Sequence, residues 1–188
     1  MTPIVDAHHH IWRLADLPWL SGPPVPRIFG EYGALRRDYS AAEFSSEAKP
    51  HGVVKSVFVQ ANVAPGREVD EVAWVQSVAD VTGFPHAIVG YADLAAPDVA
   101  AVLDRELAYA NLRGIRQQLH WHEKPAYRFA LRPDLMHDAA WRRGLKELEK
   151  LWTSYDRVVA VMRECLSGLS AAGQHAVFHD TAARVYRL

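Results

Sequence analysis

The chain has 188 residues, of which 49% are hydrophobic and 23% are charged, and its formal net charge is -1. This balance is typical of a globular protein with a sizeable core, and it lacks the basic stripe of a nucleic-acid binder and the polybasic patch of a membrane binder. No apolar run approaches the roughly 18 residues that span a bilayer, and the N-terminus has no signal-peptide pattern. The single cysteine, Cys165, cannot form an internal disulfide. We therefore expect a cytoplasmic protein with no nucleic-acid or membrane partner.

The first predicted strand ends in a cluster of three histidines. Pro3-Ile4-Val5 is typical of a buried strand, and Asp6-Ala7-His8-His9-His10-Ile11-Trp12 follows it. Because side chains alternate along a strand, His8 and His10 share one face and His9 takes the other. Two neutral imidazoles on one face can reach one metal ion. We predict that His8 and His10 bind a divalent metal, zinc or manganese. A chance cluster or an expression tag is the alternative, and the flanking sequence argues against a tag.

The rest of the chain alternates between strand and helix patterns. Residues 13–38 are rich in Pro, Gly and Trp, and we predict a long irregular loop there, of the kind that often covers an active site. Ser40-Ala41-Ala42-Glu43 is a capping-box pattern that predicts a short helix. Further strands are predicted at residues 53–60, 86–92 and 112–119. Helices are predicted at residues 68–81, 95–109, from about 135, 154–166 and 176–185.

This alternation predicts βαβ units and a parallel sheet with helices outside it. In such folds the functional groups collect at the carboxyl ends of the strands. His8, His10, Gln60 and the pair His120 and His122 all fall at those ends. Their common placement is a second argument for a functional site.

Several segments together resemble the amidohydrolase superfamily, in the amidohydrolase-related branch that includes sugar lactonases and dicarboxylate lactone hydrolases. The segments are residues 4–12, 54–60, 112–117 (Leu-Arg-Gly-Ile-Arg-Gln) and 178–186 (Phe-His-Asp-Thr-Ala-Ala-Arg-Val-Tyr). The resemblance implies a TIM-barrel-derived α/β fold and hydrolysis of a lactone or a related bond. It also implies that His8 and His10 bind a divalent metal, although some lactonases of this kind work without one. An arginine after the fourth strand often holds a substrate carboxylate, and Arg116 matches it better than Arg113, which begins the strand.

The chain is short for this fold, since a complete (β/α)₈ barrel takes about 250 residues. Only four strands are predicted, and the later-strand histidine and aspartate that the resemblance implies are not found. We therefore predict one domain over residues 1–188, a partial barrel of about four parallel β/α units plus C-terminal helices, with an internal deletion near residues 150–152. Four strands leave two unpaired sheet edges, so we expect a homo-oligomer.

Two functions follow from these observations. In the first, the chain is a hydrolase of a lactone or similar cyclic ester of a sugar acid or dicarboxylate. Its substrate would contact Arg116, Gln60, His120, His122 and Trp12, and the residue that acts as the general base is unknown. His120, His122 and Glu123 are alternatively further metal ligands or parts of a solvated loop, and Trp12, Trp19 and Trp121 either line the pocket or pack in the core. In the second, the chain is a catalytically inactive, truncated remnant that acts at most as a binding or assembly module.

Overall fold

The computed structural model describes residues 2–130, 132–151, 163 and 166–177. The chain forms two compact units, residues 1–147 and 148–188, and each is described by itself. Cys165 and most of the predicted helices at 154–166 and 176–185 lie outside the described residues. The predicted single domain and the deletion near residues 150–152 stay predictions. No helix among the described residues is long and apolar enough to cross a membrane.

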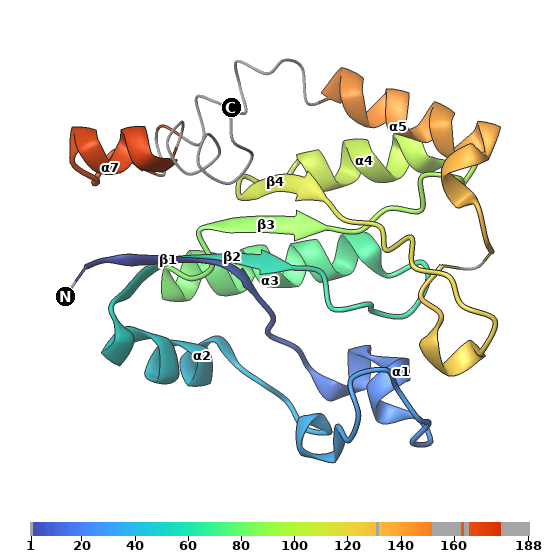
Figure 1. Cartoon of the computed structure of the whole chain (residues 1–188), viewed down its shortest axis with the longest axis horizontal. Coiled ribbons are helices and arrows are strands. Elements are labelled where there is room, and N and C mark those ends of the chain that lie inside the picture. Colours follow the sequence, from blue (N-terminus) through green and yellow to red (C-terminus); the bar gives the residue numbers. More distant parts are fainter. Residues whose placement is uncertain (1, 131, 152–162, 164–165, 178–188) are drawn as a thin grey trace. The chain divides into compact units, whose positions relative to one another are not determined.

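The first unit is built on a four-stranded parallel sheet, which confirms the predicted fold class. The strands lie in the order β1 (Ile4–His9), β2 (Val53–Val59), β3 (Ala87–Gly90) and β4 (Leu112–Ile115). Figure 1 shows the four arrows side by side and pointing in one direction. Helix α3 (Glu68–Thr82) connects β2 to β3, and α4 (Val99–Leu107) connects β3 to β4. Each strand lies next to the strand that follows it in the chain, as in the consecutive βαβ units of a barrel.

The remaining helices differ in part from the sequence prediction. The segment 13–38, predicted as an irregular loop, contains the helix α1 (Pro18–Ser21) and two 3₁₀ turns. The prediction was wrong there because a Pro at the first helical position starts a helix too short to show a hydrophobic period. The predicted capping box is confirmed, since Ser40 and Glu43 cap each other at the start of α2 (Ala41–Ala48). The other helices are α5 (Ala139–Leu151), α7 (Ala171–His175) and 3₁₀ turns at Leu14–Asp16, Gly33–Leu35, Lys49–His51, Pro125–Tyr127 and Leu135–His137.

Several predicted elements are shorter in the structure, among them α4, β3 and β4. Helix α4 begins at Val99, four residues after the predicted start, because Asp93 and Pro97 hold the preceding segment in turns. Strand β4 ends at Ile115 rather than at residue 119. Arg116 therefore lies directly after the last paired residue of β4, at the carboxyl edge of the sheet.

One face of the sheet packs against the helices and forms the core. Phe58 and Ile88 pair across β2 and β3, and both are fully buried. Val72, Val75 and Leu103 supply the facing apolar surface from α3 and α4. The first residues of β1 and β2 carry exposed apolar side chains, at Ile4, Val5 and Val54.

A buried carboxyl lies beneath β3. Glu106 of α4 is fully buried, and neither carboxyl oxygen has a hydrogen-bond partner among the described residues. A Cβ on Gly90 would lie 3.0 Å from Glu106 Oε2, so only glycine leaves room for the carboxyl. Burial, followed by the negative charges of Glu71 and Glu68, raises the pKa of Glu106 to about 8.

This shift predicts a pH-dependent stability. The folded pKa lies above the unfolded value of 4.5. The contribution of Glu106 is therefore complete below about pH 4.5 and is lost as the pH rises toward about 8. We expect the free energy of unfolding of Glu106→Gln to fall less than that of the wild type over this range, measured by denaturant unfolding. Asp104→Asn, an exposed change on the same helix, serves as the control and keeps the wild-type slope. Identical slopes for all three proteins would contradict the buried, protonated carboxyl.

Close packing at Gly144 predicts a second effect on stability. A Cβ on Gly144 of α5 would lie 2.0 Å from the Leu94 carbonyl oxygen, which is backbone and cannot rotate away. We expect Gly144→Ala to lower the free energy of unfolding by about 1–3 kcal/mol, although alanine favours a helix intrinsically. Gly33→Ala is the matched control, because a Cβ there meets nothing within 4 Å. Equal midpoints of chemical unfolding for both variants would rule out this contact.

Candidate active site

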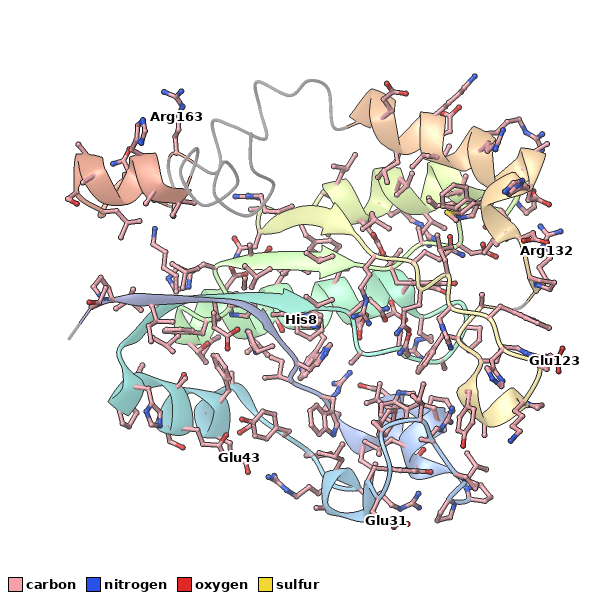
Figure 2. The ribbon with its side chains drawn as sticks, viewed as in Figure 1. His8, Glu31, Glu43, Glu123, Arg132 and Arg163 are labelled. Atoms are coloured by element: carbon pink, nitrogen blue, oxygen red, sulfur yellow. The ribbon has the colours of Figure 1, made fainter. Side chains whose placement is uncertain are left out.

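The three histidines at the end of β1 divide between two sides of the sheet, as predicted; His8 and His9 belong to the strand and His10 follows it. His8 and His10 line one cavity, whereas His9 is buried and stacks on Phe44 of α2 with ring centroids 3.9 Å apart. Between Asp6 and His9, β1 contains one more residue than the paired stretch of β2. Such a bulge re-aims side chains next to functional sites. Figure 2 labels His8 where β1 leaves the sheet, beside β2.

His10 is oriented by the end of β2. Its Nδ1 lies 2.7 Å from the Val59 carbonyl oxygen, an acceptor, so Nδ1 carries the proton. Its Nε2 then has a free lone pair and lies 3.2 Å from Nε2 of His8. Burial lowers the pKa of His10, the hydrogen bond to Val59 opposes this, and the charges of His8 and Arg116 lower it further. His10 is therefore held neutral with Nε2 directed at His8.

The histidine pair fits a divalent metal in distance and chemistry. Zinc–nitrogen bonds of about 2.0–2.1 Å in a tetrahedral centre place two ligand nitrogens about 3.3 Å apart. The separation of 3.2 Å between the two Nε2 atoms is close to that value. A carbonyl that accepts the other ring N–H is the usual support of a histidine ligand. The pair alone does not complete a site, because within residues 2–130, 132–151, 163 and 166–177 no group of three or more His, Cys, Asp or Glu is placed to hold a metal.

A cavity of about 780 Å³ opens beside the histidine pair at the carboxyl edge of the sheet. Its polar lining includes His8, His10, Gln60 and Arg116. Trp12 and Trp19 line it as well, and each is tied to backbone: Trp12 Nε1 donates to the Arg37 carbonyl at 2.7 Å and Trp19 Nε1 to the Ala61 carbonyl at 2.9 Å. The structure thus brings together five of the seven residues predicted for the site.

His120 and His122 are not among the residues that line this cavity. His120 is exposed and its carbonyl accepts the N–H groups of Phe129 and Ala130, at 2.9 and 2.8 Å. The His122 Nδ1 accepts the N–H of Lys124 at 2.9 Å. Glu123 lies on the segment after β4, well apart from His8 in Figure 2. The roles predicted for these residues stay predictions. The hydrogen bonds described for His120 and His122 are to residues of the same loop.

Gln60 is placed at the cavity but is largely committed to its own turn. Its side chain is fully buried, and its Oε1 accepts the N–H of Asn62 at 2.7 Å. Only Nε2 is left without a partner among the described residues. Gln60 can therefore offer a substrate one amide donor from a fixed position.

Arg116 lines the cavity beside Gln60. Its backbone N–H donates to the Gly90 carbonyl at 2.8 Å, and its Nη2 donates to the Gln60 carbonyl at 3.3 Å. Its Nε is buried without a partner in the described part of the chain. Arg113, in contrast, donates from its guanidinium to the carbonyls of Ala110 and Leu112 at the start of β4. Of the two arginines of the 112–117 segment, Arg116 is thus the one that lines the cavity.

Arg128 and Phe129 are among the lining residues that sequence reasoning missed. Both lie in the segment after β4, which the sequence indicated only as a polar loop. The loop folds back through the hydrogen bonds to His120 and through Arg128, which donates to the carbonyls of His122 and Glu123 at 3.1 and 3.0 Å. No periodic pattern of hydrophobic residues in the sequence predicts that this loop folds back onto the cavity. An isolated Arg-Phe pair in a polar loop was the only available signal.

Comparison with known proteins shows the family of this chain. A family model described as amidohydrolase matches residues 5–153. The chain belongs to the amidohydrolase family.

Named relatives support the lactonase-like branch. The chain is 41% identical over 155 residues to the uncharacterized protein y4mH of Sinorhizobium fredii, covering 81% of this chain and 52% of that protein. It is 28% identical over 192 residues to an L-fucono-1,5-lactonase of Burkholderia ambifaria, covering 95% and 62%. This amidohydrolase chain therefore spans about half to three fifths of the length of these relatives.

A solved structure confirms the fold relationship. A zinc-bound amidohydrolase from Burkholderia multivorans superposes with a TM-score of 0.57 at 28% identity, covering 79% of this chain and 46% of that one. The partial coverage agrees with a partial barrel of four β/α units. Zinc in that relative agrees with a divalent metal in the family.

The geometry around Val59 predicts the tautomer of His10. At neutral pH, after chelator treatment, we expect long-range ¹H–¹⁵N NMR spectra to show a protonated Nδ1 and an unprotonated Nε2 for His10, because the Val59 carbonyl requires a donor. The exposed His51 lies outside this cavity and is the reference for an unrestrained ring. A protonated Nε2 with a free Nδ1 on His10 would contradict the orientation described here.

Proposed function

We propose that this amidohydrolase is a lactonase, which hydrolyses a cyclic ester of a sugar acid or dicarboxylate with the help of a divalent metal at His8 and His10. The observation that carries the proposal is the pair of Nε2 atoms 3.2 Å apart at the edge of the large cavity, with His10 oriented by Val59 and Arg116 lining the same cavity. The lactonase name of the Burkholderia ambifaria relative supports this substrate class.

The two histidines suit the metal as neutral donors. Burial and the nearby cation of Arg116 lower the pKa of His10, so its lone pair is available at neutral pH. A divalent ion held there would act as a Lewis acid toward the ester carbonyl. Zinc or manganese fits the two imidazoles, and further oxygen ligands from water or substrate would complete the coordination.

Arg116 and the aromatic walls suit the rest of such a substrate. A guanidinium binds a carboxylate through paired, charge-assisted hydrogen bonds. Arg116 lines the cavity and its Nε is buried without a partner in the described region, so a ligand would meet the terminal nitrogens of the guanidinium. Trp12 and Trp19 give the cavity apolar walls that exclude water around a small ring.

In the proposed reaction, water adds to the lactone carbonyl and the ring C–O bond breaks. One proton of the water ends on the released alkoxide, and the product is a hydroxy acid. Of the described residues, none is placed at the cavity as a carboxylate base, since the lining side chains are amide, imidazole, guanidinium or apolar groups. This observation favours the second candidate function, a module that binds a metal or carboxylate without turnover.

We further propose that the protein is a homo-oligomer. Strands β1 and β4 each pair on one side only within the described sheet, and Ile4 and Val5 of β1 are exposed. Exposed sheet edges favour association. Native mass measured by light scattering tests this, and a monomer at micromolar concentration would contradict it.

Metal content and hydrolysis test the function together. We expect purified protein to hold about one divalent ion per chain, because two imidazoles and solvent form one site. We expect His8→Ala/His10→Ala to lose that ion in elemental analysis and to lose the release of acid from L-fucono-1,5-lactone in a pH-indicator assay. Arg116→Gln should raise KM at least tenfold for a carboxylate-bearing lactone, through loss of a charge-assisted contact.

His51→Ala is the control, because His51 is exposed and lies outside the cavity. Metal that stays bound in the double variant would overturn the assignment of His8 and His10. Metal that binds in the wild type without hydrolysis of any lactone would support the binding module instead.

A further inference from the structure

The turn after β2 is held from three directions. Gln60 donates its backbone N–H to the Val89 carbonyl of β3 at 2.8 Å. The Ala61 N–H donates to Glu71 Oε1 at 2.8 Å, and the Ala61 carbonyl accepts Trp19 Nε1 at 2.9 Å. Asn62 takes a left-handed conformation with φ of 59°, which is uncommon outside glycine. External contacts therefore define this turn, which contributes Gln60, Ala61 and Asn62 to the cavity wall.

Of the residues that hold this turn, Glu71 is the least expected, because it is a buried carboxyl. It lies in the first turns of α3, its side chain is 4% exposed, and its Oε2 has no hydrogen-bond partner among the described residues. A buried carboxyl without full pairing is costly. A carboxyl at this position is explained if it makes an interaction that an apolar side chain cannot make, such as accepting the Ala61 N–H.

Glu71 also interacts with Arg116. Burial raises the pKa of Glu71, and the charge of Arg116 lowers it. Burial lowers the pKa of Arg116, and the charge of Glu71 raises it. The Nη2 of Arg116 donates to the Gln60 carbonyl, next to the N–H that Glu71 accepts. The carboxyl of Glu71, the Gln60–Ala61 peptide and the guanidinium of Arg116 thus form one connected group.

A direct catalytic role for Glu71 does not fit the geometry. Burial raises its pKa to about 7, which is a suitable value for a general base. Glu71, however, is absent from the lining of the large cavity and instead lines a separate cavity of about 90 Å³ beside Asp16 and Trp74. Its effect on a ligand must therefore pass through Ala61 and Arg116.

We infer that Glu71 is a positioning residue, which holds the Gln60–Asn62 turn through the Ala61 N–H and thereby fixes the Gln60 carbonyl that receives the Arg116 guanidinium, so that the cavity is preformed for a carboxylate ligand. The ligand part rests on the function proposed above, because it assigns a substrate carboxylate to Arg116. The positioning part rests only on the contacts of Glu71. Preformed contacts of this kind raise affinity because less ordering is needed on binding.

Two substitutions separate the hydrogen bond from the charge. Glu71→Gln keeps an oxygen for the Ala61 N–H and removes the charge, whereas Glu71→Met removes both. Asp70→Asn is the matched control, because Asp70 is an exposed neighbour on α3 that pairs with Arg67. Amide hydrogen exchange of Ala61 and the Arg116 Nε–H signal, both by NMR, report on positioning without requiring activity.

We expect Ala61 exchange at least tenfold faster in Glu71→Met and close to wild type in Glu71→Gln and Asp70→Asn. The Arg116 Nε–H signal should shift in both Glu71 variants and stay unchanged in Asp70→Asn. Binding of L-fuconate, a sugar acid with a free carboxylate, should weaken at least fivefold in Glu71→Met. For hydrolysis of a carboxylate-bearing lactone, KM should rise more than kcat falls.

Unchanged Ala61 exchange in a folded Glu71→Met would overturn the positioning role. Equal acceleration of all sheet amides would overturn it too, because Glu71 would then support only the fold. If the wild type binds no L-fuconate and hydrolyses no lactone while Ala61 and Arg116 respond as expected, the proposed function fails and the positioning role stands.

Discussion

The pairing of β1 with β2 is the constraint on which the site depends. The ladder brings the end of β1 beside the end of β2, and the Val59 carbonyl then accepts the His10 Nδ1 proton at 2.7 Å. The extra residue in β1 and this hydrogen bond direct Nε2 of His10 toward Nε2 of His8. A one-residue slip of β1 against β2 would turn His9 toward the cavity and His8 and His10 away from it, because side chains alternate along a strand.

The cavity wall is built from backbone that neighbouring elements hold in place. Helix α3 reaches the turn through Glu71, α1 reaches it through Trp19, and the residue after β4 reaches it through Arg116. Short helices in the segment 13–38 therefore have a structural task, since Trp19 belongs to α1. Gln60 appears in the same wall with its carbonyl and its Oε1 already bonded, which makes it a part of the scaffold as much as a ligand contact.

Among the groups whose pKa values are shifted by burial, two acids lie on the helices and two bases lie at the cavity. Two buried carboxyls, Glu71 and Glu106, lie on the helices, and burial raises the pKa of both toward or above neutrality. The imidazole of His10 and the guanidinium of Arg116 lie at the cavity, and burial lowers the pKa of each. The cavity thus offers donors and lone pairs, while Glu71 contacts the turn in its wall from the helix side. This arrangement suits an anionic ligand, whose charge a carboxylate in the cavity would repel.

The sequence by itself determined the parallel α/β fold, the split of His8 and His10 from His9, and the capping box of α2. Each follows from a local rule, namely the period of two in a strand, the alternation of strand and helix, or a four-residue cap. Only the tertiary structure decided that Glu71 meets Ala61, that Gln60 bonds to its own turn, and that His120 and His122 lie outside the cavity lining. The reason is physical: these contacts join residues whose separation has no period, and loop conformation depends on partners that no local pattern records.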